Sequence, residues 1–180
     1  MKKKKVKIAI LDRDGVINKV KIKKEYIGFK KDFKWIPGAK KTIKAIKKLG
    51  YKVVVVTNQS GVARGYFSYN DVVSLHKHIQ SELKKNFTKI DKYLFCPFHV
   101  DGIVKKYSKI SKLRKPNNGI FLKIAKIWNI DKKNSFMIGD RNVDMLFAKK
   151  SGIKGYLFQE KNLYSFCKKK LFSNLSKHII

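Results

Sequence analysis

Two aspartates two positions apart, Asp12 and Asp14, follow an apolar run and precede Gly15 in the segment "AILDRDGVIN". If the chain stays extended, both side chains leave it on the same side. Carboxylates that close repel each other, and a divalent cation such as Mg²⁺, which prefers hard oxygen ligands, would cancel that repulsion. One carboxylate could then attack a phosphorus atom while the other transfers protons, and Gly15 would let the chain turn beside the ligand. For this pair taken alone, a polar turn after a strand is the alternative.

A second polar motif, "TNQSGVARG" (57–65), follows a run of valines. The Thr57 hydroxyl and the backbone N–H groups of Asn58 and Gln59 could hold phosphate oxygens at the end of a strand. Ser60 belongs to the same turn. The alternative interpretation is a polar turn punctuated by glycine.

Two further motifs contain charged residues that suit a phosphate site. In "LRKP", Pro116 keeps Lys115 out of the helical region, so a loop presents Lys115 where it could neutralise phosphate charge. In "GDRNVD", Asp140 follows a predicted strand and could complete an Mg²⁺ shell, while Asp144 could bond to nearby backbone or to Lys115. Taken singly, Lys115 could be one more solvated lysine, and Asp144 an ordinary acid at a helix N-terminus.

Predicted strands and helices alternate along the chain, which indicates the α/β class. We expect a doubly wound, mostly parallel sheet with helices on both faces. Ligands bind such sheets outside the carboxyl ends of the strands, so the motifs that follow strands should converge in one crevice. The predicted strands cover 6–12, 51–57, 89–96, 135–140 and 153–158, and the predicted helices cover 38–50, 68–85, 118–130 and 142–152.

The chain has 180 residues, of which 43% are hydrophobic, and this is enough for one domain with its own core. We expect a single domain over 1–180, with a core over about 5–158 and a basic, partly helical tail over 161–180. Only 45 positions separate Asp12 from Thr57, and 58 separate Thr57 from Lys115, so no large cap domain fits between them. On the predicted helix 68–85, His76 and His78 are expected to face solvent.

The net charge of +32 makes a nucleic-acid-binding protein one interpretation of the composition. However, only four of the 44 basic residues are arginines, and the lysines are spread over the whole chain. Base readout and bidentate phosphate binding favour arginine. We therefore expect biased composition and no specific nucleic-acid partner. The few arginines, Arg13, Arg64, Arg114 and Arg141, all lie within the motifs, which indicates that those positions need their chemistry.

No apolar run approaches the roughly 20 residues that span a bilayer. The apolar part of "MKKKKVKIAILD" is also shorter than the roughly 7–15 residues of a signal peptide. Two distant cysteines, Cys96 and Cys167, do not make a disulfide framework. These features predict a cytoplasmic protein without a membrane partner, and we expect a monomer.

Together, the motifs "LDRDGVIN", "TNQSGVARG", "CPFH", "RKP" and "GDRNVD" resemble the haloacid dehalogenase superfamily of phosphatases over about residues 8–158. They look most like its branch of D-glycero-D-manno-heptose 1,7-bisphosphate phosphatases and histidinol-phosphatases. The resemblance implies that Asp12 is the nucleophile that forms an aspartyl-phosphate, and that Asp14 is the general acid/base. Phosphoryl transfer depends mainly on positioning and charge neutralisation, which these motifs can supply.

The same resemblance implies roles for the other motif residues. Thr57 and Lys115 hold the transferring phosphoryl group, and Asp12, Asp14 and Asp140 hold the Mg²⁺, with Asp144 supporting them from behind. Arg114 and Arg141 match positions that contact the rest of the substrate. Asn58, Gln59 and Ser60 are also expected to bind the substrate. Substrate choice would fall to three loops, namely 19–35 with Glu25 and Tyr26, the "SGVARG" turn (60–65), and 96–113.

The implied substrate is a small phosphorylated sugar, D-glycero-D-manno-heptose 1,7-bisphosphate, which would lose its 7-phosphate in the synthesis of lipopolysaccharide core heptose. Histidinol phosphate is the alternative within the same branch. A nucleic-acid 3′-phosphatase, or a nucleic-acid-binding protein without activity, is a further alternative that the high positive charge would suit.

One part of the resemblance fails. The branch usually carries a zinc site of the form C-x-H … C-x-C just before R-K-P, and four-coordinate zinc needs four such ligands. Here Cys96 and His99 remain, whereas Phe98, Ser111 and Leu113 replace ligands. We therefore expect no zinc, and we expect packing, through side chains such as Phe95, Phe98 and Tyr107, to hold the loop 96–113.

Overall fold

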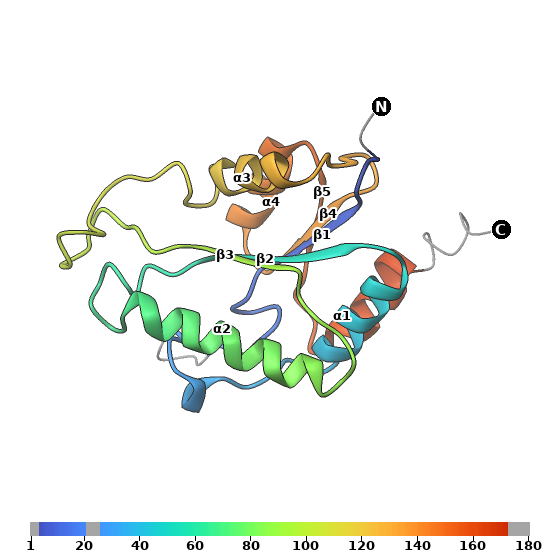
Figure 1. Cartoon of the computed structure of the whole chain (residues 1–180), viewed down its shortest axis with the longest axis horizontal. Helices are drawn as coiled ribbons and strands as arrows, with labels where there is room; N and C mark the ends of the chain where they lie inside the picture. The colour runs from blue at the N-terminus through green and yellow to red at the C-terminus, as the bar shows by residue number, and fades with distance from the viewer. Residues whose placement is uncertain (1–3, 21–25, 173–180) are drawn as a thin grey trace.

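A five-stranded sheet forms the centre of the computed structural model, which describes residues 4–20 and 26–172. All neighbouring strands pair in parallel, in the order β3-β2-β1-β4-β5 (Figure 1). The predicted fold class is therefore confirmed. The strands are β1 (Ile8–Leu11), β2 (Lys52–Asn58), β3 (Lys92–Cys96), β4 (Phe136–Gly139) and β5 (Lys154–Leu157).

Helices cover both faces of the sheet, as Figure 1 shows. On one face lie α1 (Ala39–Lys48), α2 (Tyr69–Lys84) and α5 (Leu163–Cys167), and on the other lie α3 (Gly119–Ile127) and α4 (Asn142–Ser151). Two short segments complete the described elements, a 3-10 helix η1 (Lys30–Asp32) and a π-helical turn η2 (Lys168–Phe172). The sheet is thus sandwiched between two helical layers.

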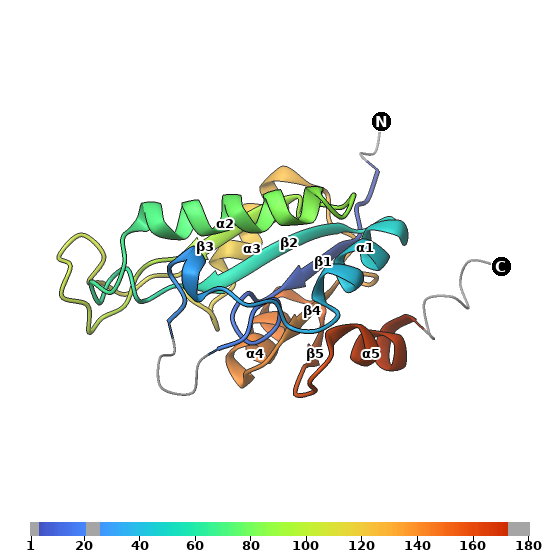
Figure 2. The same cartoon turned by 90° about the horizontal axis from the view of Figure 1, so that it is seen from below.

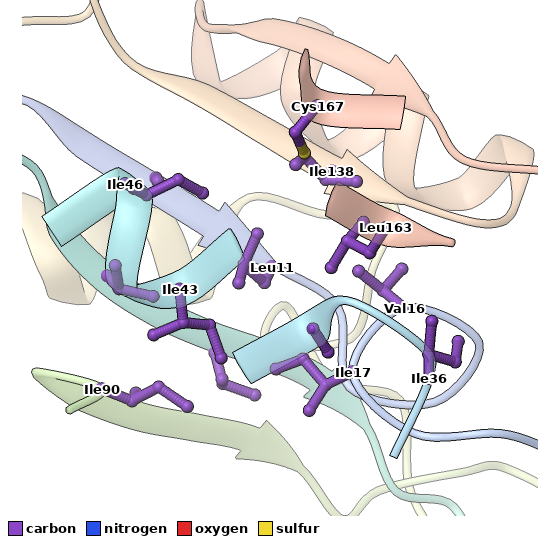
Figure 3. Close-up of a cluster of buried hydrophobic side chains, with 14 of the residues drawn as sticks. Leu11, Val16, Ile17, Ile36, Ile43, Ile46, Ile90, Ile138, Leu163 and Cys167 are labelled. Carbon is purple, nitrogen blue, oxygen red and sulfur yellow. The ribbon is translucent and has the colours of Figure 1, made fainter. Parts of the chain in front are cut away.

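Alternation along the strands explains why two helical layers form. Successive strand side chains point to opposite faces, and a parallel sheet buries both of them. Leu11 therefore packs with Ile43 and Ile46 of α1 (Figure 3), whereas Ile10 packs in a separate cluster with Phe121 of α3. Each face of each central strand thus has its own apolar partner, which fixes the register of the sheet.

The chain order places a crevice at the end of β1. From β1 the chain proceeds to β2 and β3 on one side, then returns to β4 and β5 on the other. Leu11 pairs with Val55 of β2 and Ile138 of β4, so three strands end at one edge. Such a switch point is where α/β sheets bind ligands.

Two loops extend from this edge and lie against each other. The loop between β3 and α3 lies beside the segment between β2 and α2 in both Figures 1 and 2. The backbone N–H groups of Ile103 and Val104 donate to the Ala63 carbonyl at 2.8 and 2.9 Å. Across residues 4–20 and 26–172, no separate cap domain stands over the sheet edge, as the sequence predicted.

The segment after β5 packs onto the domain. Leu163, Phe166 and Leu171 are buried in the cluster that contains Leu11 and Ile43. The prediction of a partly helical tail is confirmed up to Phe172, and residues 173–180 lie outside the described part, as do 21–25 in the loop after the first motif. None of the described helices is long and apolar enough to cross a membrane.

Candidate active site

The polar motifs converge where β1, β2 and β4 end. Asp12 directly follows β1, Thr57 lies near the end of β2, and Asp140 directly follows β4. A cavity of about 480 Å³ opens there. It is bordered by the four predicted catalytic residues, Asp12, Asp14, Thr57 and Lys115, and by the predicted substrate residues Tyr26, Asn58, Ser60, Arg114 and Arg141.

Lys115 is buried at the base of this cavity and joins two of the acidic motifs. Its Nζ lies 3.0 Å from Asp12 Oδ1 and 2.6 Å from Asp144 Oδ1, and it donates to the Val56 carbonyl at 3.0 Å. Burial alone would lower the pKa of Lys115, but the carboxylates of Asp12 and Asp144 outweigh it and leave that pKa raised. Lys115 therefore stays charged beside Asp12, as a phosphoryl-binding lysine must.

Asp12 and Asp140 are arranged to receive positive charge. Burial raises the pKa of Asp12 to about 7, against the opposing effect of Lys115 and with additions from Asp144, Asp14 and Asp140. Burial and the Asp144 carboxylate also raise the pKa of Asp140. The Oδ1 atom of Asp140 is buried and has no hydrogen-bond partner among the described residues. Crowded carboxylates with one free buried oxygen fit a hard divalent cation.

The carboxylates near enough to share one ion differ in part from the predicted set. Among the described residues, Asp12, Asp140 and Asp144 each offer an oxygen within 4.8 Å of the others. Asp144 is already engaged with Lys115 and accepts from the Arg141 backbone N–H at 3.2 Å, as a residue that supports the site from behind would. The Asp14 carboxylate is not part of this group.

The Asp14 carboxylate is instead held by three side chains. Its Oδ1 accepts from Arg13 Nε at 3.1 Å and from Asn18 Nδ2 at 2.9 Å. Its Oδ2 accepts from Arg13 Nη2 at 3.0 Å and from Gln59 Nε2 at 2.7 Å. With these four hydrogen bonds the carboxylate has one fixed orientation at the edge of the cavity.

Asn58 and Gln59 were predicted to hold phosphate oxygens through their backbone N–H groups. The Gln59 backbone N–H instead donates to the Cys96 carbonyl at 2.8 Å, and the side chains of both residues bind protein groups. The Asn58 amide bonds to the Lys115 backbone, and Gln59 Nε2 also donates to Thr57 Oγ1 at 3.0 Å. Gln59 is buried and does not border the cavity. Both amides thus hold other site residues in place, and no pattern in the sequence indicated these pairings.

The cavity mouth is positively charged. Arg114 is half-buried, its Nη1 has no hydrogen-bond partner among the described residues, and burial lowers its pKa. Arg141, in the "GDRNVD" motif after β4, also borders the cavity, and its Nε lies 3.9 Å from Asp140 Oδ2. His99 also borders the cavity. From the sequence, His99 was considered only as a remaining zinc-ligand position, and its place at the cavity was not predicted. An anionic group beyond the reacting phosphate would find partners here.

The loop 96–113 is packed through aromatic side chains, as predicted. Phe98 and Tyr107 lie with ring centroids 5.9 Å apart, and Tyr107 packs with Phe95 against the cluster around Phe67. His99 Nδ1 lies 3.4 Å from Arg64 Nη2 and 3.5 Å from Asp101 Oδ2. Burial raises the pKa of the Cys96 thiol.

The prediction that His76 faces solvent was wrong. His76 is buried beneath the Arg13 side chain, which is itself completely buried. His76 lies four positions after Val72 and three before Ile79, both of which are buried on α2. This helical spacing was the signal that would have placed His76 on the inner face. His78 is off this stripe and lies against Phe33.

The comparisons with known proteins agree with this geometry. A family model described as "Polynucleotide kinase 3 phosphatase" matches residues 7–175. A D-glycero-beta-D-manno-heptose-1,7-bisphosphate 7-phosphatase of Rhodopseudomonas palustris is 42% identical over 91% of this chain and 89% of its own. A D-glycero-alpha-D-manno-heptose-1,7-bisphosphate 7-phosphatase of Photorhabdus laumondii is 37% identical over 85% and 82%.

A solved structure shows the same likeness. The D,D-heptose 1,7-bisphosphate phosphatase from B. bronchiseptica, complexed with magnesium and phosphate, superposes with a TM-score of 0.77 at 26% identity, over 92% of this chain and 88% of its own. The fold and the site therefore define a phosphatase of the haloacid dehalogenase type. The chain belongs to this family of phosphoric monoester hydrolases, on the branch whose curated members are named heptose-1,7-bisphosphate 7-phosphatases.

Proposed function

We propose that the protein removes the 7-phosphate of D-glycero-D-manno-heptose 1,7-bisphosphate through an aspartyl-phosphate intermediate. The observation that carries this proposal is the buried ion pair between Asp12 and Lys115 at the base of a cavity with an arginine-lined mouth. The names of the relatives supply the sugar. The product would serve lipopolysaccharide core synthesis in the cytoplasm, and we propose that the chain acts as a monomer.

The first half-reaction uses Asp12 and Asp14. An Asp12 carboxylate oxygen attacks the phosphorus of the 7-phosphate, and the bond from phosphorus to the sugar oxygen breaks. Asp14 carries a proton in place of one of the four hydrogen bonds that its carboxylate accepts, and gives this proton to the departing sugar oxygen, so the sugar leaves as an alcohol. Lys115 and the Thr57 hydroxyl hold the equatorial oxygens of the transferring group and balance their charge.

The second half-reaction restores the enzyme. A water molecule attacks the phosphorus of the aspartyl-phosphate while the Asp14 carboxylate takes a proton from that water. The bond from phosphorus to Asp12 breaks, inorganic phosphate leaves, and both aspartates return to their starting states. One residue thus donates a proton in the first step and accepts one in the second.

Mg²⁺ fits the carboxylates at this edge. We propose that Asp12, Asp140 and the backbone carbonyl of Asp14 hold it, with Asp144 behind them. The buried, unpaired Oδ1 of Asp140 supports this assignment. When bound, the ion neutralises the charge of the phosphate and of the crowded carboxylates. No zinc is proposed, because only Cys96 and His99 remain of the four ligand positions.

The distal phosphate explains why a bisphosphate would suit this cavity. Arg114 and Arg141 line the same cavity as Asp12, and His99 and Tyr26 line it too. A bisphosphate whose reacting end lies on Asp12 would place its other end among these cations. Histidinol phosphate lacks a second phosphate and would leave them without an anionic partner.

A phosphate-release assay tests the proposal directly. Purified protein is given heptose 1,7-bisphosphate of either anomeric form, histidinol phosphate, and a 3′-phosphorylated oligonucleotide, each with and without Mg²⁺. We expect release from heptose bisphosphate that needs Mg²⁺ and that Asp12→Asn abolishes. Preferred turnover of the oligonucleotide would overturn the substrate assignment, and unchanged turnover in Asp12→Asn would overturn the nucleophile.

A further inference from the structure

Arg13 lies between the two aspartates of the first motif and has no exposed surface. A buried guanidinium is tolerated only when its donors have partners. Nε and Nη2 bind the two oxygens of Asp14, and Nη2 also donates to the Ile27 carbonyl. The remaining nitrogen, Nη1, lies 3.4 Å from His76 Nε2. All three guanidinium nitrogens are therefore accounted for.

His76 supplies an acceptor for Arg13 from the neighbouring helix. Nη1 can only donate, so the contact requires Nε2 of His76 to be unprotonated, with the ring proton on Nδ1. The ring is held by Tyr93, which stacks on it at a centroid distance of 4.7 Å, and by the edge of Phe95 at 5.7 Å. A rigid, neutral imidazole thus determines where the guanidinium fork lies.

We propose that His76 is a positioning residue that acts through Arg13 on Asp14. The fork of Arg13 grips both oxygens of Asp14 in parallel, so a rotation of the guanidinium turns the carboxylate with it. Gln59 and Asn18 hold the same carboxylate from the other side. The chain from α2 to Asp14 therefore sets the direction in which the proposed acid/base faces the leaving sugar oxygen.

This inference rests on the proposed function, in which Asp14 transfers the proton. Its consequence is a change in turnover rather than in substrate binding, because neither Arg13 nor His76 borders the cavity. A small displacement of a proton-transfer group affects the chemical step most strongly. If His76 only filled space under α2, its substitution would not lower kcat while leaving KM unchanged.

The test compares three substitutions on one helix. His76→Phe keeps the ring that stacks on Tyr93 but removes the acceptor for Arg13, whereas His76→Gln keeps an acceptor. His78→Phe is the matched control, because His78 lies on the same helix away from Arg13. Phosphate release from heptose 1,7-bisphosphate with Mg²⁺ gives kcat and KM for each variant.

We expect His76→Phe to lower kcat about tenfold or more, with KM within about twofold of wild type. His76→Gln should recover most of the lost turnover, and His78→Phe should match wild type. Equal losses in His76→Phe and His76→Gln, or a wild-type kcat in His76→Phe, would overturn the inference. A wild-type protein that releases no phosphate would instead overturn the proposed function, so the two failures are distinct.

An NMR measurement reports on the contact independently of turnover. The chain has only four arginines, so the Nε–H signal of Arg13 can be assigned by its loss in Arg13→Lys. We expect this signal to exchange slowly with water in wild type and in His76→Gln, and to shift and exchange faster in His76→Phe. An Arg13 signal that is the same in His76→Phe as in wild type would contradict the proposal.

Discussion

The side-chain amide of Asn58, at the end of β2, pairs with both backbone groups of Lys115. Asn58 Oδ1 accepts from the Lys115 N–H at 3.0 Å, and Asn58 Nδ2 donates to the Lys115 carbonyl at 3.1 Å. Lys115 comes from the loop before α3, 57 positions away in the chain. This amide pair therefore fixes the loop lysine to the strand end that carries Thr57.

Replacing Asn58 should loosen Lys115 without removing its charge. Asn58→Ala leaves the Lys115 backbone N–H and carbonyl without protein partners, which typically costs about 1–3 kcal/mol of unfolding free energy. Because Lys115 then loses its fixed position on the phosphoryl group, we expect kcat to fall by about tenfold or more. Denaturant unfolding and phosphate release measure the two effects. Asn86→Ala, at an exposed asparagine, is the control, and equal behaviour of the two variants would contradict the argument.

Gly15 should be required for the proposed metal site for two reasons. A side chain there would clash with Asp140, and the backbone has a positive φ. Its φ is 84°, and a Cβ there would lie 2.1 Å from Asp140 Oδ2. Gly50 has a similar φ of 81° with nothing within 4 Å, so Gly50→Ala carries the backbone penalty alone. Both alanine variants should lose about 1–2 kcal/mol of stability from their positive φ.

The two glycine variants should differ in metal binding. Gly15→Ala must displace the Asp140 carboxylate, and we expect its affinity for Mg²⁺ or Mn²⁺ in calorimetric titration to fall by about tenfold or more. Gly50→Ala should bind the ion as wild type does. Equal affinities in all three proteins would show that Asp140 is not a ligand.

The sequence predicted the sheet and the convergence of its motifs for one physical reason. Parallel strands all end at the same edge, so residues that follow buried strands must meet. Asp12, Thr57 and Asp140 were placed correctly from their positions after apolar runs alone. Lys115 was predicted to lie in a loop because it precedes Pro116, and the residue before a proline is disfavoured in a helix.

Side-chain hydrogen bonds between segments far apart in the chain were not predictable in the same way. The burial of Arg13 requires both the Ile27 carbonyl and His76, which come from two segments far apart in the chain. The Asn58 amide could have faced substrate or protein, and only the path of the loop before α3 decides between them. Local sequence patterns carry no information on such pairings.

His76 should make stability depend on pH. Burial, together with the charge of Arg13, lowers the pKa of His76 well below its ordinary value. The unfolded chain therefore binds a proton at this position first as the pH falls, so folding stability declines below a pH of about 6.5. At pH 5.5 the loss from this one residue is on the order of 1 kcal/mol relative to high pH.

A variant without a titrating group isolates this effect. His76→Gln should remove that part of the decline, so the difference in unfolding free energy between it and wild type changes between pH 7.5 and pH 5.5. His78→Gln serves as the control on the same helix. Parallel pH profiles for wild type and His76→Gln would contradict a neutral, buried His76.

The loop 96–113 should depend on Tyr107 and not on zinc. Tyr107 contacts the Phe98 ring, and its carbonyl accepts from the His99 backbone N–H at 3.2 Å. We expect Tyr107→Ser to speed tryptic cleavage within this lysine-containing loop, because the aromatic contacts that order it are lost. Tyr164→Ser, in α5, should leave the rate at these sites unchanged.

A strong zinc chelator should change neither the cleavage rate nor the unfolding midpoint of wild type. One zinc bound per chain in elemental analysis would show that Cys96 and His99 have other ligands, and that the loop is held in a different way.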